Sequence, residues 1–117
     1  MEAWYRNIQT IVEEIDSCIR SEADDSLTLT ALAQHLGYSE YTVSRRFREI
    51  SGMTLKHYVH HRKLAFALKE VRDTDQSLLT IALRYGYSSH EAFSRTFKEA
   101  FGVSPSEYRA HPFPTAL

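Results

Sequence analysis

Hydrophobic residues recur every three or four positions along most of this chain, a spacing typical of amphipathic helices. The first stripe runs from Trp4 to Ala23 opposite an acidic face, and a second covers residues 29–36 behind a candidate N-cap, Thr28. From Thr54 the pattern continues for about 17 residues, or roughly 25 Å of helix at 1.5 Å per residue. No stretch alternates with a period of two, so we predict an all-α fold.

One segment of the chain occurs twice. Residues 37–47 read GYSEYTVSRRF, and residues 86–97 read GYSSHEAFSRTF, which is one residue longer. The pairing extends past this segment and joins Gly37 to Gly86, Ser39 to Ser88, Ser44 to Ser94, Arg45 to Arg95, Phe47 to Phe97, Glu49 to Glu99 and Tyr58 to Tyr108. A period of about 50 residues that keeps turn glycines, serines and aromatic residues together indicates an internal duplication.

The first copy has the local signals of two helices joined by a sharp turn. Gly37 ends a short helix because glycine accepts the left-handed backbone of a helix C-terminus, and Ser39 caps the next helix, from Glu40 to about Ile50. We expect its inward side chains to be Val43, Phe47 and Ile50. Its outward side chains are Tyr41, Ser44, Arg45 and Arg48. A short helix, a glycine turn and a capped second helix form a helix-turn-helix arrangement.

The second copy repeats these signals. Ser77 caps a short helix that ends at Gly86, and Ser88 with Glu91 forms a capping box that begins the next helix. We expect the inward side chains of that helix to be Phe93, Phe97 and Ala100. We expect the outward side chains to be Glu91, Ser94, Arg95 and Lys98, with His90 at the rim of that face.

A short capped helix and a proline-containing segment end the chain. Ser104, Pro105 and Glu107 supply an N-cap, a first-turn proline and a first-turn acid, whereas the two prolines of residues 111–117 cannot continue a helix. We therefore divide the chain into an N-terminal helix with a first helix-turn-helix subdomain (1–52), a linker helix (53–73), a second helix-turn-helix subdomain (74–110) and a tail or start of a linker (111–117).

Charge is distributed unevenly along the chain. The net charge is −1, yet residues 1–25 hold seven acids against two bases, and residues 26–117 hold eight acids against twelve bases. Association with a polyanion depends on the field at one face, so the negative total does not exclude nucleic acid. No apolar run reaches the roughly 18 residues that a membrane span needs, and no secretion signal begins the chain, so we expect a cytoplasmic, nucleoid-associated protein.

The second helix of each copy suits the major groove of DNA, which is about 12 Å wide. Arginine can bond guanine N7 and O6 together, the small serines beside Arg45 and Arg95 permit close approach, and Tyr41 can pack on a thymine methyl group or a sugar. Two such helices can enter successive grooves, which lie roughly 34 Å apart. We therefore predict a sequence-specific transcription regulator that binds double-stranded promoter DNA.

From about residue 5 to residue 110, the chain resembles the DNA-binding domain of the AraC/XylS family of bacterial transcription regulators, including its MarA-like and Rob-like members. The motifs that carry the resemblance are LAQHLGYSEYTVSRRFREISGMTLKHYVHHRKL and IALRYGYSSHEAFSRTFKEAFGVSPSEYR. The resemblance implies about seven helices, arranged as two helix-turn-helix subdomains joined by a long linker helix. By position, it assigns base reading to Tyr41, Ser44, Arg45, His90, Glu91, Ser94 and Arg95. It assigns contacts with the DNA backbone to Ser39, Arg48, Ser88, Thr96 and Lys98.

The sequence departs from the family pattern in two ways. Glu91 stands where members often carry a neutral amide, so the second half either accepts a hydrogen bond from a cytosine amine or binds DNA more weakly. The family usually attaches a ligand-sensing or oligomerising domain, which does not fit within 117 residues. We expect either a short stand-alone regulator or part of a longer one, and we favour an effector domain beyond the C-terminal prolines. RNA polymerase is the expected protein partner.

Other classes of function have weaker support. The chain shows no nucleophile with an adjacent base, no glycine-rich phosphate loop and no catalytic carboxylate pair, so we expect neither an enzyme nor a cofactor. His57, His60 and His61 share a helical face, but no carboxylate or cysteine completes a metal site. The alternative is a helical protein-interaction module without direct DNA readout, which the lack of large apolar anchors on the outward faces disfavours.

Overall fold

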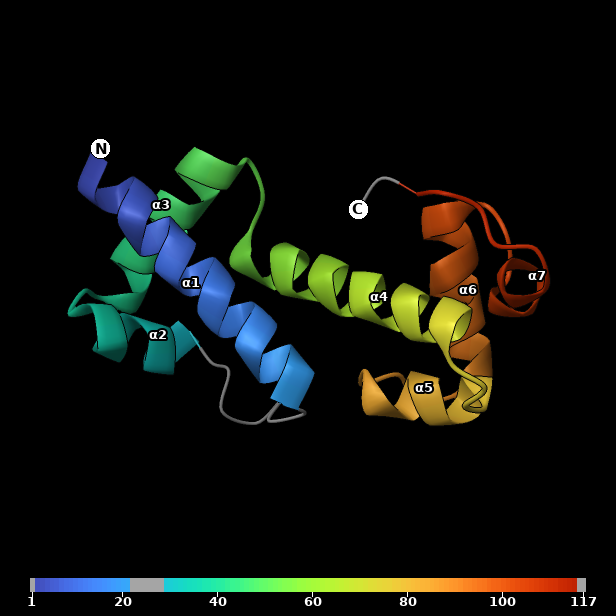
Figure 1. The fold of residues 1–117 in the computed structure, drawn as a ribbon. Coiled ribbons are helices and arrows are strands. Elements are labelled where there is room, and N and C mark those ends of the chain that lie inside the picture. The colour runs from blue at the N-terminus through green and yellow to red at the C-terminus, as the bar shows by residue number, and fades with distance from the viewer. Residues whose placement is uncertain (1, 22–28, 116–117) are drawn as a thin grey trace. The chain divides into compact units, whose positions relative to one another are not determined.

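The computed structural model describes residues 2–21 and 29–115, and within them it contains α-helices and no strand. The helices are α1 (Glu2–Ser21), α2 (Leu29–Leu36), α3 (Glu40–Ser51), α4 (Leu55–Asp73), α5 (Leu78–Arg84), α6 (His90–Phe101) and α7 (Pro105–Ala110), as Figure 1 shows. The predicted all-α fold with about seven helices is confirmed. The predicted cap Thr28 lies outside the described residues.

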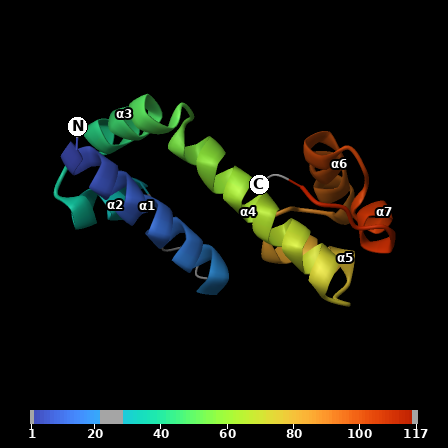
Figure 2. The same ribbon diagram turned by 45° about the horizontal axis from the view of Figure 1, so that its top comes forward.

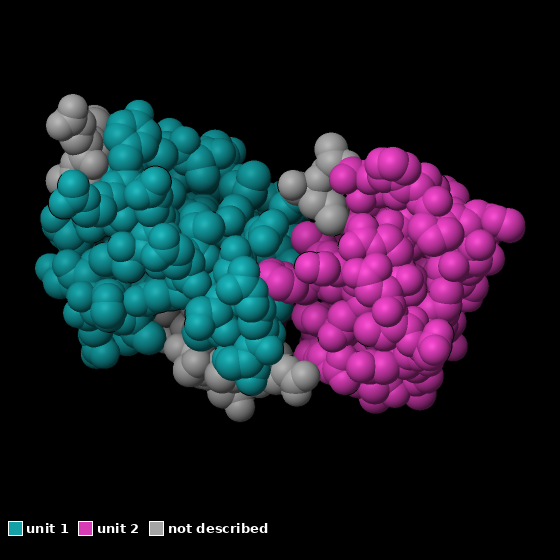
Figure 3. Space-filling model, viewed as in Figure 1, with its two compact units in different colours: residues 1–62 teal, residues 63–117 magenta. Residues whose placement is uncertain are grey.

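The chain divides into two compact units, residues 1–62 and residues 63–117 (Figure 3). The boundary falls within α4, so this helix contributes residues to both units. Each unit holds one copy of the repeated segment and buries its own set of hydrophobic side chains.

In unit 1, α1 packs against α3 through the apolar stripe of α1. Ile11 and Ile15 of α1 are fully buried, as are Val43 and Phe47 of α3. These residues recur every four positions on each helix, so one face of each helix supplies the core. The two inward positions Val43 and Phe47 agree with the prediction from the sequence.

In unit 2, aromatic side chains of α6 and α7 form the centre of the core. The ring of Phe97 lies 5.7 Å from Phe93, 4.7 Å from Phe101 and 5.9 Å from Tyr108, measured between ring centroids. Such spacings suit tilted and edge-to-face aromatic contacts. Helix α6 packs against α5 and α7 (Figure 2). Helix α4 adds the buried residues Leu64, Ala67, Leu68 and Val71.

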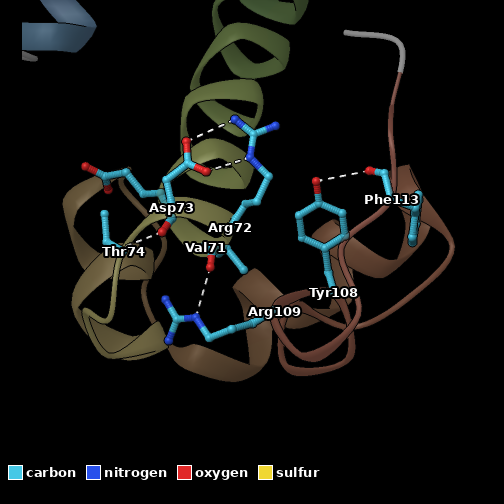
Figure 4. Close-up of polar contacts among 8 residues, drawn as sticks. Val71, Arg72, Asp73, Thr74, Tyr108, Arg109 and Phe113 are labelled. Atoms are coloured by element: carbon cyan, nitrogen blue, oxygen red, sulfur yellow. Dashed lines mark hydrogen bonds and ion pairs between the residues drawn. The ribbon is translucent and has the colours of Figure 1, made fainter.

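The C-terminal part of unit 2 is fixed by hydrogen bonds to main-chain carbonyls (Figure 4). Arg109 Nε donates to the carbonyl oxygen of Val71 at 2.9 Å, which ties α7 to the C-terminal end of α4. The Tyr108 hydroxyl donates to the carbonyl oxygen of Phe113 at 3.3 Å, and their rings meet edge to face at 5.2 Å. The segment after α7 therefore folds back against its own unit.

An arginine–carboxylate pair fastens α4 inside each unit. In unit 1, Arg62 donates to both carboxylate oxygens of Asp16 on α1, at 3.0 and 3.3 Å. In unit 2, Arg84 Nη1 on α5 lies 2.8 and 2.9 Å from the two carboxylate oxygens of Glu70. All four side chains are partly buried, with exposed fractions between 17% and 26%. Burial makes such pairs less sensitive to salt than surface pairs.

The helix end at the glycine is alike in both copies, and each glycine ends a short helix as predicted. Gly37 and Gly86 have φ angles of +78° and +88°, the left-handed conformation that side chains with a Cβ rarely adopt. The residue after each glycine donates its N–H to a carbonyl oxygen five residues earlier, which closes the helix end in a Schellman motif. These bonds are Tyr38 N to Ala33 O at 3.1 Å and Tyr87 N to Ala82 O at 3.0 Å.

The N-cap of α6 is Ser89 and not Ser88, so the predicted capping box of Ser88 with Glu91 is wrong. Ser89 Oγ accepts a hydrogen bond from the Ala92 N–H at 3.1 Å, as Ser39 does at the start of α3. The physical reason is the position of the extra residue in the second copy, which lies in the turn before the helix. Ser39 therefore corresponds to Ser89.

Ala100 is exposed, which corrects its predicted inward position. Phe93 and Phe97 are the buried residues of α6, and they are four positions apart. Ala100 lies three positions after Phe97, near the end of the helix, where its small side chain stays outside the aromatic core. The other predicted caps of unit 2 are confirmed, because Ser77 Oγ accepts from Thr80 N and Ser104 Oγ accepts from Glu107 N.

The corrected cap position can be tested by paired substitutions. We expect Ser89→Ala to lower the free energy of unfolding by about 1 kcal/mol, because the substitution leaves the Ala92 N–H without its acceptor. Ser88→Ala should have little effect, since Ser88 is exposed and outside α6. Urea denaturation followed by circular dichroism measures both values. A larger loss for Ser88→Ala would show that the first serine caps the helix.

Candidate nucleic-acid interface

Helix α3 presents a polar outer face opposite its buried residues Val43 and Phe47. Ser39 caps the helix, and Tyr41, Ser44 and Arg45 are all exposed, Tyr41 to 71% and the Arg45 side chain to 61%. Arg48 is also exposed, one turn after Ser44. The predicted site residues of the first copy therefore lie on one accessible side of one helix.

These outer residues line a surface groove of about 330 Å³ beside the start of α2. The groove is lined by Leu29, Glu40, Tyr41, Ser44, Arg45 and Arg48. A hydrogen bond of 3.1 Å from Thr30 Oγ1 to Glu40 Oε1 joins α2 to the first turn of α3. The groove therefore combines aromatic, hydroxyl and guanidinium groups, which are suited to contacts with base edges and sugars.

The Arg45 guanidinium is held by its own helix. Arg45 Nε donates to Glu49 Oε1 at 2.8 Å, and Arg46 Nη1 donates to Glu49 Oε2 at 3.4 Å. The hydrogen bond and charge of Glu49 raise the pKa of Arg45 above its ordinary value, and Tyr41 raises it further. Arg45, like any arginine, is a permanent cation, and its Nε is bonded to a carboxylate one turn along the helix.

Of the second set of predicted site residues, only Glu91, Arg95 and Lys98 lie on the side of α6 opposite Phe93 and Phe97, because His90 is three positions before Phe93 and therefore close to the buried side. Glu91, Arg95 and Lys98 are exposed, whereas the other members are partly buried, namely His90, Ser94 and Thr96. Ser88 is exposed but precedes the helix and its cap. With Ser39 and Ser89 aligned as the capping serines, Glu91 is the counterpart of Tyr41, because each lies two residues after its cap.

The two outer faces differ in charge. Helix α3 carries three arginines against two glutamates, whereas α6 carries Arg95 and Lys98 against two glutamates. With histidine neutral, the difference is one positive charge. Helix α3 therefore offers a polyanion one more positive charge than α6 does.

Two acidic residues at this surface, Glu40 and Glu49, were not among the site residues predicted from the sequence. Glu49 binds Arg45 and Arg46, and Glu40 lines the groove and accepts from Thr30. The contact between Arg45 and Glu49 could have been predicted from their i,i+4 spacing, because residues four apart are neighbours on a helix surface. The contact between Thr30 and Glu40 had no such signal, because it joins two different helices.

The described residues include no group of three or more histidine, cysteine or acidic side chains placed to hold a metal ion. His57 and His60 are both exposed on α4. None of the described helices combines the length and apolar character that a membrane crossing requires.

Comparison with known proteins first defines the class. A family model described as a helix-turn-helix domain matches residues 32–111, which include both turns and both outer helices. Among curated relatives, the transcriptional activator AarP of Providencia stuartii is 38% identical over 100 residues, which cover 86% of this chain and 74% of AarP. The regulatory protein SoxS of Salmonella typhimurium is 38% identical over 102 residues, which cover 87% of this chain and 92% of SoxS.

A solved structure agrees on the fold. The structure of a transcriptional regulator from Chromobacterium violaceum, with an AraC-type DNA-binding domain, aligns with a TM-score of 0.81 over 97% of this chain and 100% of that chain, at 24% identity. The chain belongs to the AraC/XylS family of sequence-specific DNA-binding transcription regulators. The alternative of a protein-interaction module without DNA readout is not favoured.

Proposed function

We propose that this protein binds double-stranded promoter DNA by placing α3 and α6 in two successive major grooves. The observation that carries the proposal is the repeated helix-turn-helix, in which an exposed arginine and a small serine occupy equivalent places on the outer helix of each copy. One chain then supplies two reading helices, a task that often takes a dimer. The proposal assigns residues 53–73 to the linker between the two subdomains.

Individual roles follow from side-chain chemistry. Arg45 and Arg95 read guanine, and Glu91 accepts a hydrogen bond from a cytosine amine. The other proposed base-reading residues are Tyr41, Ser44, His90 and Ser94. The proposed contacts with the DNA backbone come from Ser39, Arg48, Ser88, Thr96 and Lys98. Because Ser88 precedes α6, its contact would come from the turn and not from a helix cap.

Further partners are proposed on the family resemblance. RNA polymerase is the proposed protein partner, which is consistent with the description of AarP as a transcriptional activator. An effector domain outside this chain is proposed because the family usually carries one. We place the protein in the cytoplasm at the nucleoid, and we propose no catalytic activity.

The test is selection of a binding site from a random-sequence duplex library, followed by binding measurements over a salt series. We expect an enriched sequence, because Arg45 and Arg95 discriminate between bases. Affinity should fall linearly with salt on logarithmic axes, with a slope of about 0.9 per phosphate contact. If no sequence is enriched and binding does not depend on salt, the proposal is wrong.

The arrangement of two grooves is tested on the same selected duplex. Inserting five base pairs between the two contacted segments turns one half of the site by about half a helical turn. We expect the insertion to abolish tight binding, because both helices can no longer reach their bases together. An unchanged affinity would mean that one subdomain is sufficient.

A further inference from the structure

The two reading arginines differ in how they are held. Arg45 Nε donates to Glu49 Oε1 at 2.8 Å, four residues along α3. Arg95 has Glu99 at the same spacing, yet within residues 2–21 and 29–115 no ion pair joins Arg95 to Glu99. The duplication therefore kept the acid in both copies, but the acid orients an arginine only in the first.

The residue beside the arginine gives a physical reason for this difference. In the first copy, Arg46 Nη1 lies 3.4 Å from Glu49 Oε2, so the two carboxylate oxygens bind two different arginines. In the second copy, Thr96 stands in place of Arg46 and offers no cation. Two charge-assisted bonds hold the Glu49 carboxylate in one orientation, whereas Glu99 lacks this support.

The contact between Arg45 and Glu49 leaves the terminal amino groups of the Arg45 guanidinium free of Glu49. Glu49 accepts from Nε, which lies at the base of the guanidinium group. The terminal Nη1 and Nη2 groups are the fork that bonds guanine N7 and O6 together. Fixing Nε limits rotation of the group before DNA arrives, and less conformational freedom is then lost on binding.

We propose that Glu49 is a positioning residue, which sets the Arg45 guanidinium for guanine reading, and that Glu99 has no such role toward Arg95. This inference rests on the proposed function of α3. As a consequence, the Arg45 side chain is ordered before DNA binds, whereas the Arg95 side chain becomes ordered only when it contacts DNA.

The test compares Glu49→Gln with the matched control Glu99→Gln, using a duplex that the wild-type protein selects from a random library. The base pair read by each arginine is the one at which Arg45→Ala or Arg95→Ala flattens the base preference. At the base pair read by Arg45, we expect Glu49→Gln to reduce the preference for the selected base by about three- to tenfold. This loss is smaller than the full discrimination that a bidentate arginine–guanine contact provides. Glu99→Gln should leave the preference at the Arg95 base pair unchanged.

Two further measurements separate positioning from general effects. On random duplex, Glu49→Gln should bind as well as the wild type or better, because a carboxylate near the phosphates has been removed. In the Arg45→Ala background, Glu49→Gln should change nothing at the Arg45 base pair, whereas a purely structural role would reduce affinity in both backgrounds. Circular dichroism confirms that each variant is folded.

Several outcomes would overturn the inference. If Glu49→Gln leaves the base preference intact while Arg45→Ala removes it, Arg45 reads DNA without help from Glu49. If Glu49→Gln sharpens the preference, Glu49 competes with DNA for Arg45. If no duplex is enriched by the wild-type protein, the proposed function fails and this inference fails with it.

Discussion

Arg45→Ala should weaken binding to the selected duplex by about 1–3 kcal/mol and flatten the preference at one base pair. The side chain is 61% exposed on the outer face of α3, so its loss leaves no cavity in the core of unit 1. The effect should therefore lie in DNA readout and not in folding. Competition binding against a panel of single base-pair substitutions measures both the affinity and the preference.

Lys98→Ala is the matched control for Arg45→Ala. Lys98 is exposed on α6, and its proposed contact is with phosphate, which carries no sequence information. It should weaken binding to all duplexes alike and reduce the salt slope by about one. Equal losses for Arg45→Ala on selected and random duplexes would instead assign Arg45 to the DNA backbone.

Phe97→Ala should lower the free energy of unfolding by about 3–5 kcal/mol. The Phe97 side chain is 0% exposed and touches three other aromatic rings of unit 2, so its removal leaves a cavity that the core cannot easily fill. A loss of this size is a large part of the 5–15 kcal/mol that stabilises a typical domain. Urea denaturation followed by circular dichroism measures it.

Two comparisons locate the effect of Phe97→Ala. Lys98→Ala, at the next position on α6, should change the stability by less than about 0.5 kcal/mol because that side chain is exposed. Trp4 is the only tryptophan and lies in unit 1, so its fluorescence reports that unit. A loss confined to unit 2 would shift the circular-dichroism transition more than the fluorescence transition. A small loss of stability would mean that the aromatic core repacks.

Most of the fold could be predicted because its signals are local. Glycine at a left-handed helix end and serine at an N-cap act over three to five residues, so Gly37, Gly86 and Ser39 could be assigned from the sequence. Apolar spacing then identified Val43, Phe47, Phe93 and Phe97 as buried, whereas the predicted inward residues Ile50 and Ala100 are partly buried and exposed, respectively. The helical period gives the side of the helix on which a residue lies but not how deeply it is buried, and Ala100 is exposed near the end of α6.

The N-cap of α6 was predicted one residue too early, because neighbouring residues alone do not determine it. Two consecutive serines, Ser88 and Ser89, both precede α6, and either could begin a helix by composition. The Glu91 side chain favoured Ser88 through the capping-box pattern. Only the length of the turn after Gly86 decides between them, and that length depends on how α5 and α6 pack together.

The candidate site was predictable in position but not in its interactions. Exposure of Tyr41, Arg45 and Arg95 follows from the helical period, and the structure shows all three exposed. The Glu49 carboxylate contacts Arg46 as well as Arg45, and the second copy has Thr96 in place of Arg46. The sequence places the same pair of residue types in both copies, so spacing alone could not show that, within the described residues, Arg45 pairs with Glu49 but Arg95 does not pair with Glu99.

The two arginine–carboxylate pairs that fasten α4 give the protein an uneven response to ionic strength. The pairs Arg62–Asp16 and Arg84–Glu70 are partly buried, whereas the cationic side chains proposed to contact DNA, Arg45, Arg48, Arg95 and Lys98, are exposed. Salt ions compete strongly with the proposed DNA contacts and weakly with the two partly buried ion pairs. A salt gradient should therefore elute the protein from an immobilised duplex while it is still folded, and desalting should restore its ability to bind.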